Sequence, residues 1–165
     1  MSYNRSDSMQ VSEIMTRKPV VIQKGTSIKK AAETMKRFNV GSVPVLDKRK
    51  VVGFFTGDDM VFKVLAEGKV PSKTLVDEIM IQDVISITPA STVKEAMEML
   101  AENDIKRLPV IDKEKNLVGF VTIKDILRIE PTMMDLAIEK IRFDEDRRQE
   151  AIRKYVEQDD ILSNI

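Results

Sequence analysis

Apolar side chains recur at helical spacing in two separate stretches of the chain. In the first stretch they are Ile28, Ala31, Ala32 and Met35, and in the second they are Val93, Ala96, Met97 and Leu100. The spacing i, i+3, i+4, i+7 is that of a helix with one apolar face. Each helix is followed by two short apolar runs around a charged turn, which predicts a β-hairpin. The predicted strands are 43–47 and 51–56, then 108–112 and 117–122.

Further elements flank each helix and hairpin. Short β-branched runs at 20–22 and 84–87 precede the two helices and predict strands, while 58–66 and 124–129 predict a second helix in each stretch. Thr92 and Glu95 are spaced as a capping box at the start of the second amphipathic helix. Each stretch therefore predicts the order β-α-β-β-α.

The two stretches are copies of one unit. A shift of 65 residues aligns 11–50 with 76–115, a shift of 66 aligns 51–60 with 117–126, and 18 of the 50 positions are identical. Units of about 60 residues are marginally stable alone. We therefore expect a mixed α/β (α+β) fold in which two repeats pack about a pseudo-twofold axis. The predicted boundaries are an N-terminal arm 1–8, repeats at 9–67 and 76–131, a linker 68–75 and a helical extension 132–165.

The extension has helical spacing on either side of a charged segment, 144–149. Its apolar positions are Met134, Ala137, Ile138 and Ile141, then Ala151, Ile152, Tyr155 and Val156. Residues 139–160 hold six basic and eight acidic side chains, which favours a partly exposed helix over a nucleic-acid contact.

Composition excludes several kinds of chemistry. The chain has 27 basic and 27 acidic residues, so its formal net charge is zero and no general field attracts nucleic acid or an anionic membrane. It has no Cys and no His, which removes disulfides, thiolate nucleophiles and catalytic triads built on histidine. The polar first ten residues show no signal-peptide pattern, and the apolar runs are strand-length. We expect a cytoplasmic protein that is not an enzyme and has no metal site of its own.

The same motif occurs at one strand-to-helix junction in each repeat. Residues 53–59 read GFFTGDD and 119–125 read GFVTIKD, so both give Gly, two apolar residues, Thr, two variable residues and Asp. One interpretation is structural, with Thr56 and Thr122 as N-caps and Asp59 and Asp125 in the first turn. The other is a nucleotide site, because a helix N-terminus favours phosphate and a carboxylate can accept both hydroxyls of a ribose. The two interpretations are compatible.

The duplicated unit, with VPVLD and LPVID followed by these motifs, resembles the cystathionine-β-synthase (CBS) domain, and the tandem pair resembles a Bateman module. The resemblance covers about residues 9–130. It implies a regulatory module that binds an adenosine-containing ligand in clefts between the repeats and performs no chemistry. AMP, ADP or ATP is the leading expectation, with S-adenosylmethionine or NAD(H) as the alternative. Any magnesium would arrive with the nucleotide.

The resemblance also implies two clefts, each built from both repeats. The first cleft would use Thr122, Lys124, Asp125, Arg107, Thr16, Val20, Val40 and Gly41. The second cleft would use Thr56, Asp58, Asp59, Ser42, Ile81, Ile85, Ile105 and Lys106. In each cleft the aspartate of the motif, Asp125 or Asp59, would hold the ribose.

The two clefts differ in charge. Lys124 and Arg107 stand beside the first motif, whereas the aligned positions of the second are Asp58 and Ser42. A carboxylate there repels a polyphosphate by about 1 kcal/mol or more. We therefore expect the phosphorylated nucleotide in the first cleft. The second cleft would bind phosphate weakly, stay empty, or bind an uncharged or cationic adenosine derivative. Lys106 would partly offset the repulsion of phosphate by Asp58.

Other functions and partners remain open at this point. The family resemblance implies a homodimer, and the apolar sequence 60–65, with Ile126, Leu127 and Ile129, is the candidate dimer surface. An effector protein is implied but not identified. The main alternative is a constitutive dimerisation scaffold with vestigial clefts. A nucleotide hydrolase is disfavoured, because the chain lacks a Walker-type loop as well as His and Cys.

Overall fold

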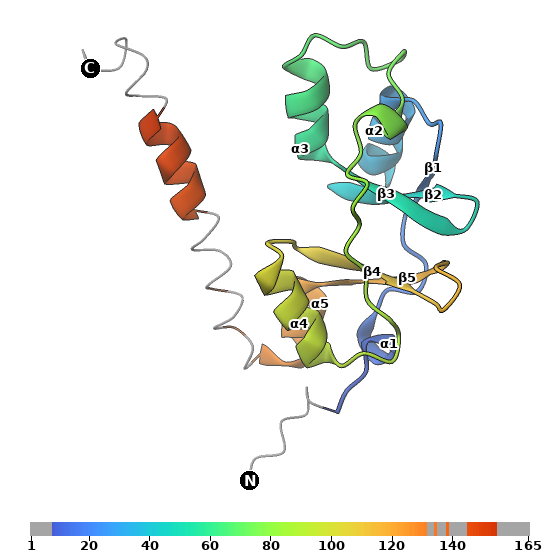
Figure 1. Cartoon of the computed structure of the whole chain (residues 1–165), viewed down its shortest axis with the longest axis vertical. Coiled ribbons are helices and arrows are strands. Elements are labelled where there is room, and N and C mark those ends of the chain that lie inside the picture. Colours follow the sequence, from blue (N-terminus) through green and yellow to red (C-terminus); the bar gives the residue numbers. More distant parts are fainter. Residues whose placement is uncertain (1–7, 132–133, 135–137, 139–144, 155–165) are drawn as a thin grey trace.

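The two repeats lie one above the other, with their β-hairpins facing each other (Figure 1). The computed structural model describes residues 8–131, Met134, Ile138 and 145–154. The first repeat holds β1 (Ile22–Gln23), α2 (Ile28–Phe38), β2 (Ser42–Asp47), β3 (Lys50–Thr56) and α3 (Gly57–Met60), which runs into a π-helix over Val61–Leu65. The second holds α4 (Val93–Glu102), β4 (Arg107–Ile111), β5 (Leu117–Thr122) and α5 (Ile123–Ile129). The mixed helix and strand composition confirms the predicted fold class.

The predicted hairpins form, but the first strand is shorter than predicted in both repeats, and of the strand predicted at 20–22 only Ile22 lies in β1. β1 pairs in parallel with β2. The hairpin strands pair antiparallel, β2 with β3 and β4 with β5. The predicted strand at 84–87 is wrong, because it is reduced to a single parallel bridge between Ile87 and Val110. In the first repeat Lys24 donates its backbone N–H to Leu46, at 2.8 Å. The aligned residue in the second repeat is Pro89, which has no N–H to continue the ladder.

Side-chain caps fix where the long helices begin. The Ser27 hydroxyl accepts from the Lys30 backbone N–H at the start of α2. At the start of α4, Thr92 Oγ1 accepts from the Glu95 N–H at 3.1 Å, and Glu95 Oε2 accepts from the Thr92 N–H at 2.8 Å. The predicted capping box is therefore confirmed.

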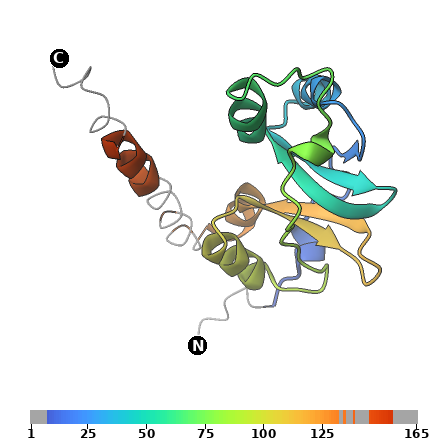
Figure 2. The same cartoon turned by 45° about the horizontal axis from the view of Figure 1, so that its top comes forward.

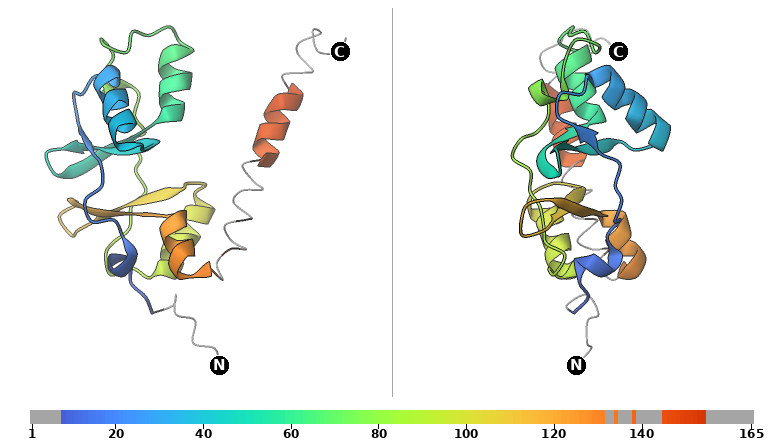
Figure 3. Two further views of the ribbon diagram at one scale, coloured as in Figure 1. Left: turned by 180° about the vertical axis from the view of Figure 1, so that it is seen from behind. Right: turned by 90° about the vertical axis from the view of Figure 1, so that its right-hand side faces the viewer.

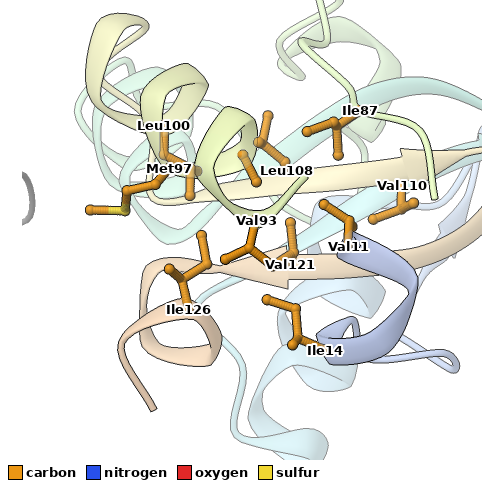
Figure 4. Packing of buried hydrophobic residues seen from close by; sticks show 11 residues of the cluster. Val11, Ile14, Ile87, Val93, Met97, Leu100, Leu108, Val110, Val121 and Ile126 are labelled. Carbon is orange, nitrogen blue, oxygen red and sulfur yellow. The ribbon is translucent and has the colours of Figure 1, made fainter. Parts of the chain in front are cut away.

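Each repeat contributes its first segment to the core of the other repeat. The short helix α1 (Val11–Ile14) buries Val11 and Ile14 against the second repeat, where Figure 4 shows them facing Val121 and Ile126. The chain then crosses to the first repeat to form β1, as Figure 3 shows from behind. In return, the 3₁₀ turn Val76–Glu78 places Val76 and Ile79 in the core of the first repeat. The apolar pattern of the sequence did not predict these two short helices or their exchange.

Strand pairing and ring stacking join the repeats at their centre. Thr16 pairs with Phe120 of β5, and Ile81 pairs with Phe54 of β3, each through two backbone hydrogen bonds of 2.8–3.0 Å. The Phe54 and Phe120 rings stack with centroids 5.9 Å apart and an interplanar angle of 8°. Thr16 and Ile81 are therefore held against β5 and β3, the strands that lead into the two Thr-x-x-Asp motifs.

Residues 145–154 form a helix that stands beside the two-repeat body (Figure 2). All ten of these residues are exposed, both 145–149 of the predicted charged segment and the predicted apolar positions Ala151 and Ile152. Met134 and Ile138 are helical and exposed, whereas the predicted apolar positions Ala137, Ile141, Tyr155 and Val156 lie outside the described residues. Among the helices of the described part, none has the length and apolar character to cross a membrane.

Candidate functional site

Both Thr-x-x-Asp motifs form the same capping box at the start of a helix. Asp125 Oδ2 accepts from the Thr122 backbone N–H at 3.0 Å and from the Thr122 hydroxyl at 2.7 Å, while Thr122 Oγ1 accepts from the Asp125 N–H at 3.2 Å. Thr56 and Asp59 make the same three hydrogen bonds, at 3.0, 2.7 and 3.1 Å. The N-cap interpretation of these residues is confirmed. One oxygen of each carboxylate is thereby occupied.

The other carboxylate oxygen has different surroundings in the two motifs. Asp59 Oδ1 lies 2.7 Å from Lys63 Nζ, and the Asp59 side chain is only 7% exposed. Asp125 Oδ1 lies 3.8 Å from the guanidinium of Arg128, a side chain that is 71% exposed, and Asp125 itself is 19% exposed. The second oxygen of Asp125 is thus held loosely, and that of Asp59 is held closely.

A cavity of about 480 Å³ lies between the repeats, beside the motif of Thr56. Ligand pockets usually have volumes of about 300–1,000 Å³. Seven of the eight residues that the sequence assigns to the second cleft line this cavity, namely Thr56, Asp58, Ser42, Ile81, Ile85, Ile105 and Lys106. The eighth, Asp59, is not part of the lining, in keeping with its contact to Lys63.

Ser42 gives this second cleft an unused polar group. The residue is 6% exposed and lines the cavity. Its Oγ is buried and has no hydrogen-bond partner among the described residues. A buried hydroxyl without a partner costs about 1–3 kcal/mol, so a ligand atom that hydrogen bonds to it would recover that cost.

Arg107 lies in the second cleft, although the sequence placed it in the first. Its backbone pairs with Thr122 across the second hairpin. Its side chain lines the cavity beside Gly41, and its Nη2 lies 3.7 Å from where a Cβ on Gly41 would stand. Partial burial lowers the pKa of this guanidinium from its usual value. Gly41, also assigned to the first cleft, lines the same cavity.

The remaining residues of the first cleft surround the motif of Thr122 less closely. Thr16 is bound to Phe120, two residues before Thr122. Lys124 is exposed on the first turn of α5. Val20 and Val40 are partly buried and pack against the core of the first repeat. Of the eight residues assigned to the first cleft, Arg107 and Gly41 are thus in the wall of the second.

Charges of both signs line the second cleft. The carboxylates are Asp58, Asp83 and Asp104, and the cations are Lys106, Arg107 and Arg147. Arg147, from the helix 145–154, forms an ion pair with Asp104. Six further residues line the cavity and were not predicted from the sequence, namely Phe54, Asp83, Val84, Asp104, Pro109 and Arg147. Asp104 aligns with Asn39, and both have a positive φ just after a helix, a position that does not by itself mark a ligand site.

Similarity to known proteins agrees with this architecture. The family model for the CBS domain matches residues 11–66 and 76–131, about two thirds of the chain. The chain belongs to the CBS-domain family. Its pair of CBS domains makes it a regulatory module, and the solved structures that it resembles include other CBS pairs. Within the described residues, no group of three or more acidic side chains is arranged to hold a metal ion.

Relatives of this CBS-domain protein include stand-alone members of the family. It is 31% identical over 136 residues to an uncharacterized protein of Methanopyrus kandleri, covering 82% of this chain and 69% of that protein. It is 32% identical over 116 residues to the CBS domain-containing protein YhcV of Bacillus subtilis, covering 70% and 81%. The CBS domain pair of protein MJ0100, solved with 5′-methylthioadenosine and S-adenosyl-L-methionine, is 30% identical with a TM-score of 0.66, covering 73% and 94%.

Proposed function

We propose that this protein is a sensor that binds an adenosine-containing ligand between its two CBS repeats without catalysis. The second-cleft cavity carries the proposal, because both repeats supply its walls and a Thr-x-x-Asp motif stands at its edge. A ligand there contacts both repeats at once. It therefore favours one relative arrangement of the repeats to the extent that it binds that arrangement more tightly.

We propose that the first cleft takes the phosphorylated nucleotide, AMP, ADP or ATP. Its support is the loosely held oxygen of Asp125, which suits a ribose hydroxyl, and the cation of Lys124 on the first turn of α5. Helix N-termini also favour phosphate. Magnesium, where present, arrives bound to the nucleotide.

The second cleft suits an adenosine derivative with little net charge. Asp58 and Asp83 line it together with Lys106 and Arg107, so a polyphosphate meets both attraction and repulsion. An uncharged thioether nucleoside or a cationic sulfonium nucleoside fits this mixture better. The related pair MJ0100, solved with 5′-methylthioadenosine and S-adenosyl-L-methionine, supports this ligand class.

The test is a thermal-shift panel on the purified chain. AMP, ADP, ATP, S-adenosylmethionine, 5′-methylthioadenosine and NADH are each added at millimolar concentration, with GMP and GTP as controls. A ligand at 100 times its Kd adds about 2.7 kcal/mol of stability. For a chain of this size the midpoint rises by roughly 5–10 °C. A rise with an adenosine ligand and none with the guanosine controls supports the sensor, whereas a flat panel on nucleotide-free protein contradicts it.

An exposed apolar surface favours a second candidate function, the dimerisation scaffold. Val61, Phe62 and Leu65 on the π-helix are 49%, 66% and 60% exposed, and Ile129 is 38% exposed. Exposed apolar patches of this kind often mark protein interfaces. Sedimentation of the ligand-free protein and of a Phe62→Glu variant tests this candidate. A ligand-independent dimer that Phe62→Glu dissociates, together with a flat ligand panel, would favour the scaffold.

A further inference from the structure

We infer that Lys63 withholds the Asp59 carboxylate from a ribose, so that a nucleoside in the second cleft binds without the carboxylate contact that Asp125 offers in the first. The inference rests on the proposed function, because it concerns how the same clefts choose their ligand. It assigns a specificity role to a residue that lies outside the Thr-x-x-Asp motif.

Lys63 is held in place from two sides. Its ammonium lies 2.7 Å from Asp59 Oδ1 and donates to the backbone carbonyl of Ile79 at 3.1 Å. Ile79 belongs to the segment that the second repeat contributes to the first core. The lysine therefore bridges the π-helix and the exchanged segment, and this second contact fixes the ammonium over the carboxylate.

The contact with Lys63 leaves Asp59 with little capacity to accept hydrogen bonds from a ligand. Its Oδ2 already accepts from the Thr56 backbone N–H and hydroxyl, and its Oδ1 faces the ammonium. The residue is 6% exposed and is not part of the cavity lining. A ribose offers two hydroxyl donors, so it needs an oxygen that is both accessible and unoccupied. Asp59 offers neither while Lys63 is in place.

Among the described residues, the second repeat has no equivalent bridge. The residue that aligns with Lys63 is Ile129, which has no charge to place over Asp125. Within the part of the chain that the structure describes, the exposed Arg128 is the one cation that approaches Asp125 Oδ1, at 3.8 Å. Because the capping hydrogen bonds of the two motifs are otherwise alike, the lysine is the main local difference at the carboxylate.

The experiment measures adenosine binding by isothermal titration calorimetry. Adenosine carries no phosphate, so removing a lysine changes no phosphate contact. The Asp125→Ala variant serves as the parent, since it removes the ribose carboxylate of the first cleft. Lys63→Met is added to it as the test, Lys63→Arg as the matched control that keeps the cation, and Lys63→Met with Asp59→Ala as the control that removes the acceptor.

We expect Lys63→Met to raise the affinity of the parent for adenosine by roughly tenfold or more, because a hydrogen bond to a charged acceptor is strong. Lys63→Arg leaves the affinity at the parent's value, and the added Asp59→Ala removes the gain. Lys63→Gln tests the same point with a neutral side chain of similar length. Thermal unfolding of each variant shows whether it is folded under the conditions of the titration.

The possible results separate the two claims. A gain that depends on Asp59 supports the role of Lys63. A second result overturns that role and leaves the proposed function standing. In that case the wild-type protein binds an adenosine ligand, but the folded Lys63→Met and Lys63→Gln variants bind adenosine no more tightly than their parent. A gain that survives Asp59→Ala also overturns it. If neither adenosine nor any adenosine ligand of the thermal-shift panel binds to the wild type or to any variant, the proposed function is overturned, and this inference with it.

Discussion

Replacing Gly119 by alanine places a methyl group where the exchanged N-terminal segment packs. A Cβ at this position would lie 2.5 Å from Met15 Sδ and 3.1 Å from the Thr16 carbonyl oxygen. That carbonyl accepts the Phe120 backbone N–H at 3.0 Å, so it is tied to the same strand. The methionine must change rotamer and the backbone must shift. Over-packing of this kind costs about 1–3 kcal/mol of unfolding free energy.

The aligned glycine, Gly53, is the matched comparison. The three atoms nearest to a Cβ on Gly53 would all belong to the side chain of Met80, whose Cγ would lie at 2.8 Å. We therefore expect Gly53→Ala also to cost about 1–3 kcal/mol, because the two glycines pack against equivalent methionines.

Urea denaturation of the two variants measures the costs, and thermal unfolding checks them, since 1 kcal/mol shifts the midpoint of such a chain by about 2–4 °C. A double-mutant cycle adds Met15→Ala, which opens the space that the new methyl group needs. We expect Met15→Ala to cost less in the Gly119→Ala background than in the wild type, with a coupling of about 0.5–3 kcal/mol. Strictly additive costs, or a Gly119→Ala protein as stable as the wild type, would refute the packing of α1 and its following residues on the second repeat.

Three further predictions concern the motifs and one turn. Thr122→Ala removes a helix cap and should lower the unfolding free energy by about 0.5–2 kcal/mol, measured in urea; no change would contradict the cap. Asp125→Ala should weaken AMP or ADP binding far more than Asp59→Ala in calorimetry, and equal losses would contradict the unequal clefts. The Asn116 side chain, donating to Asp112 Oδ2 at 3.0 Å, lowers the pKa of this half-buried carboxyl. Because the folded pKa is depressed, the stabilisation is present above the unfolded-state pKa and is lost as the pH falls through the folded pKa. Asn116→Ala should therefore raise the pKa in an NMR titration and destabilise the protein at neutral pH more than in acid; an unshifted pKa would refute the assignment.

The hairpins and long helices were predictable because each depends on its own residues. The shortened strand at 84–87 was also encoded locally, since Pro89 removes a donor that Lys24 provides in the first repeat. The exchange of segments was not predictable from the pattern. Residues 11–15 read VSEIM and 76–80 read VDEIM, so the two segments present the same apolar side chains to either core.

The candidate site was predictable to a similar degree. Most residues of the second cleft were predicted because their backbone position decides where they lie. Ser42 and Thr56 stand at a strand start and a strand end, so they line the cavity whatever their rotamers. The Asp59–Lys63 contact has the i, i+4 spacing that favours an ion pair on a helix. Arg107 was assigned to the first cleft, and its side chain lines the cavity of the second, since a long flexible side chain at the centre of the molecule reaches either side.

Methyl NMR of isoleucine- and valine-labelled protein tests most directly whether an adenosine ligand binds between the repeats. AMP should shift the methyl signals of Val20 and Val40, and 5′-methylthioadenosine should shift those of Ile85 and Ile105, which line the second cleft. Ile28, fully buried in the first core, should not move. Saturating additions of both ligands that leave all four cleft signals unchanged would contradict the account.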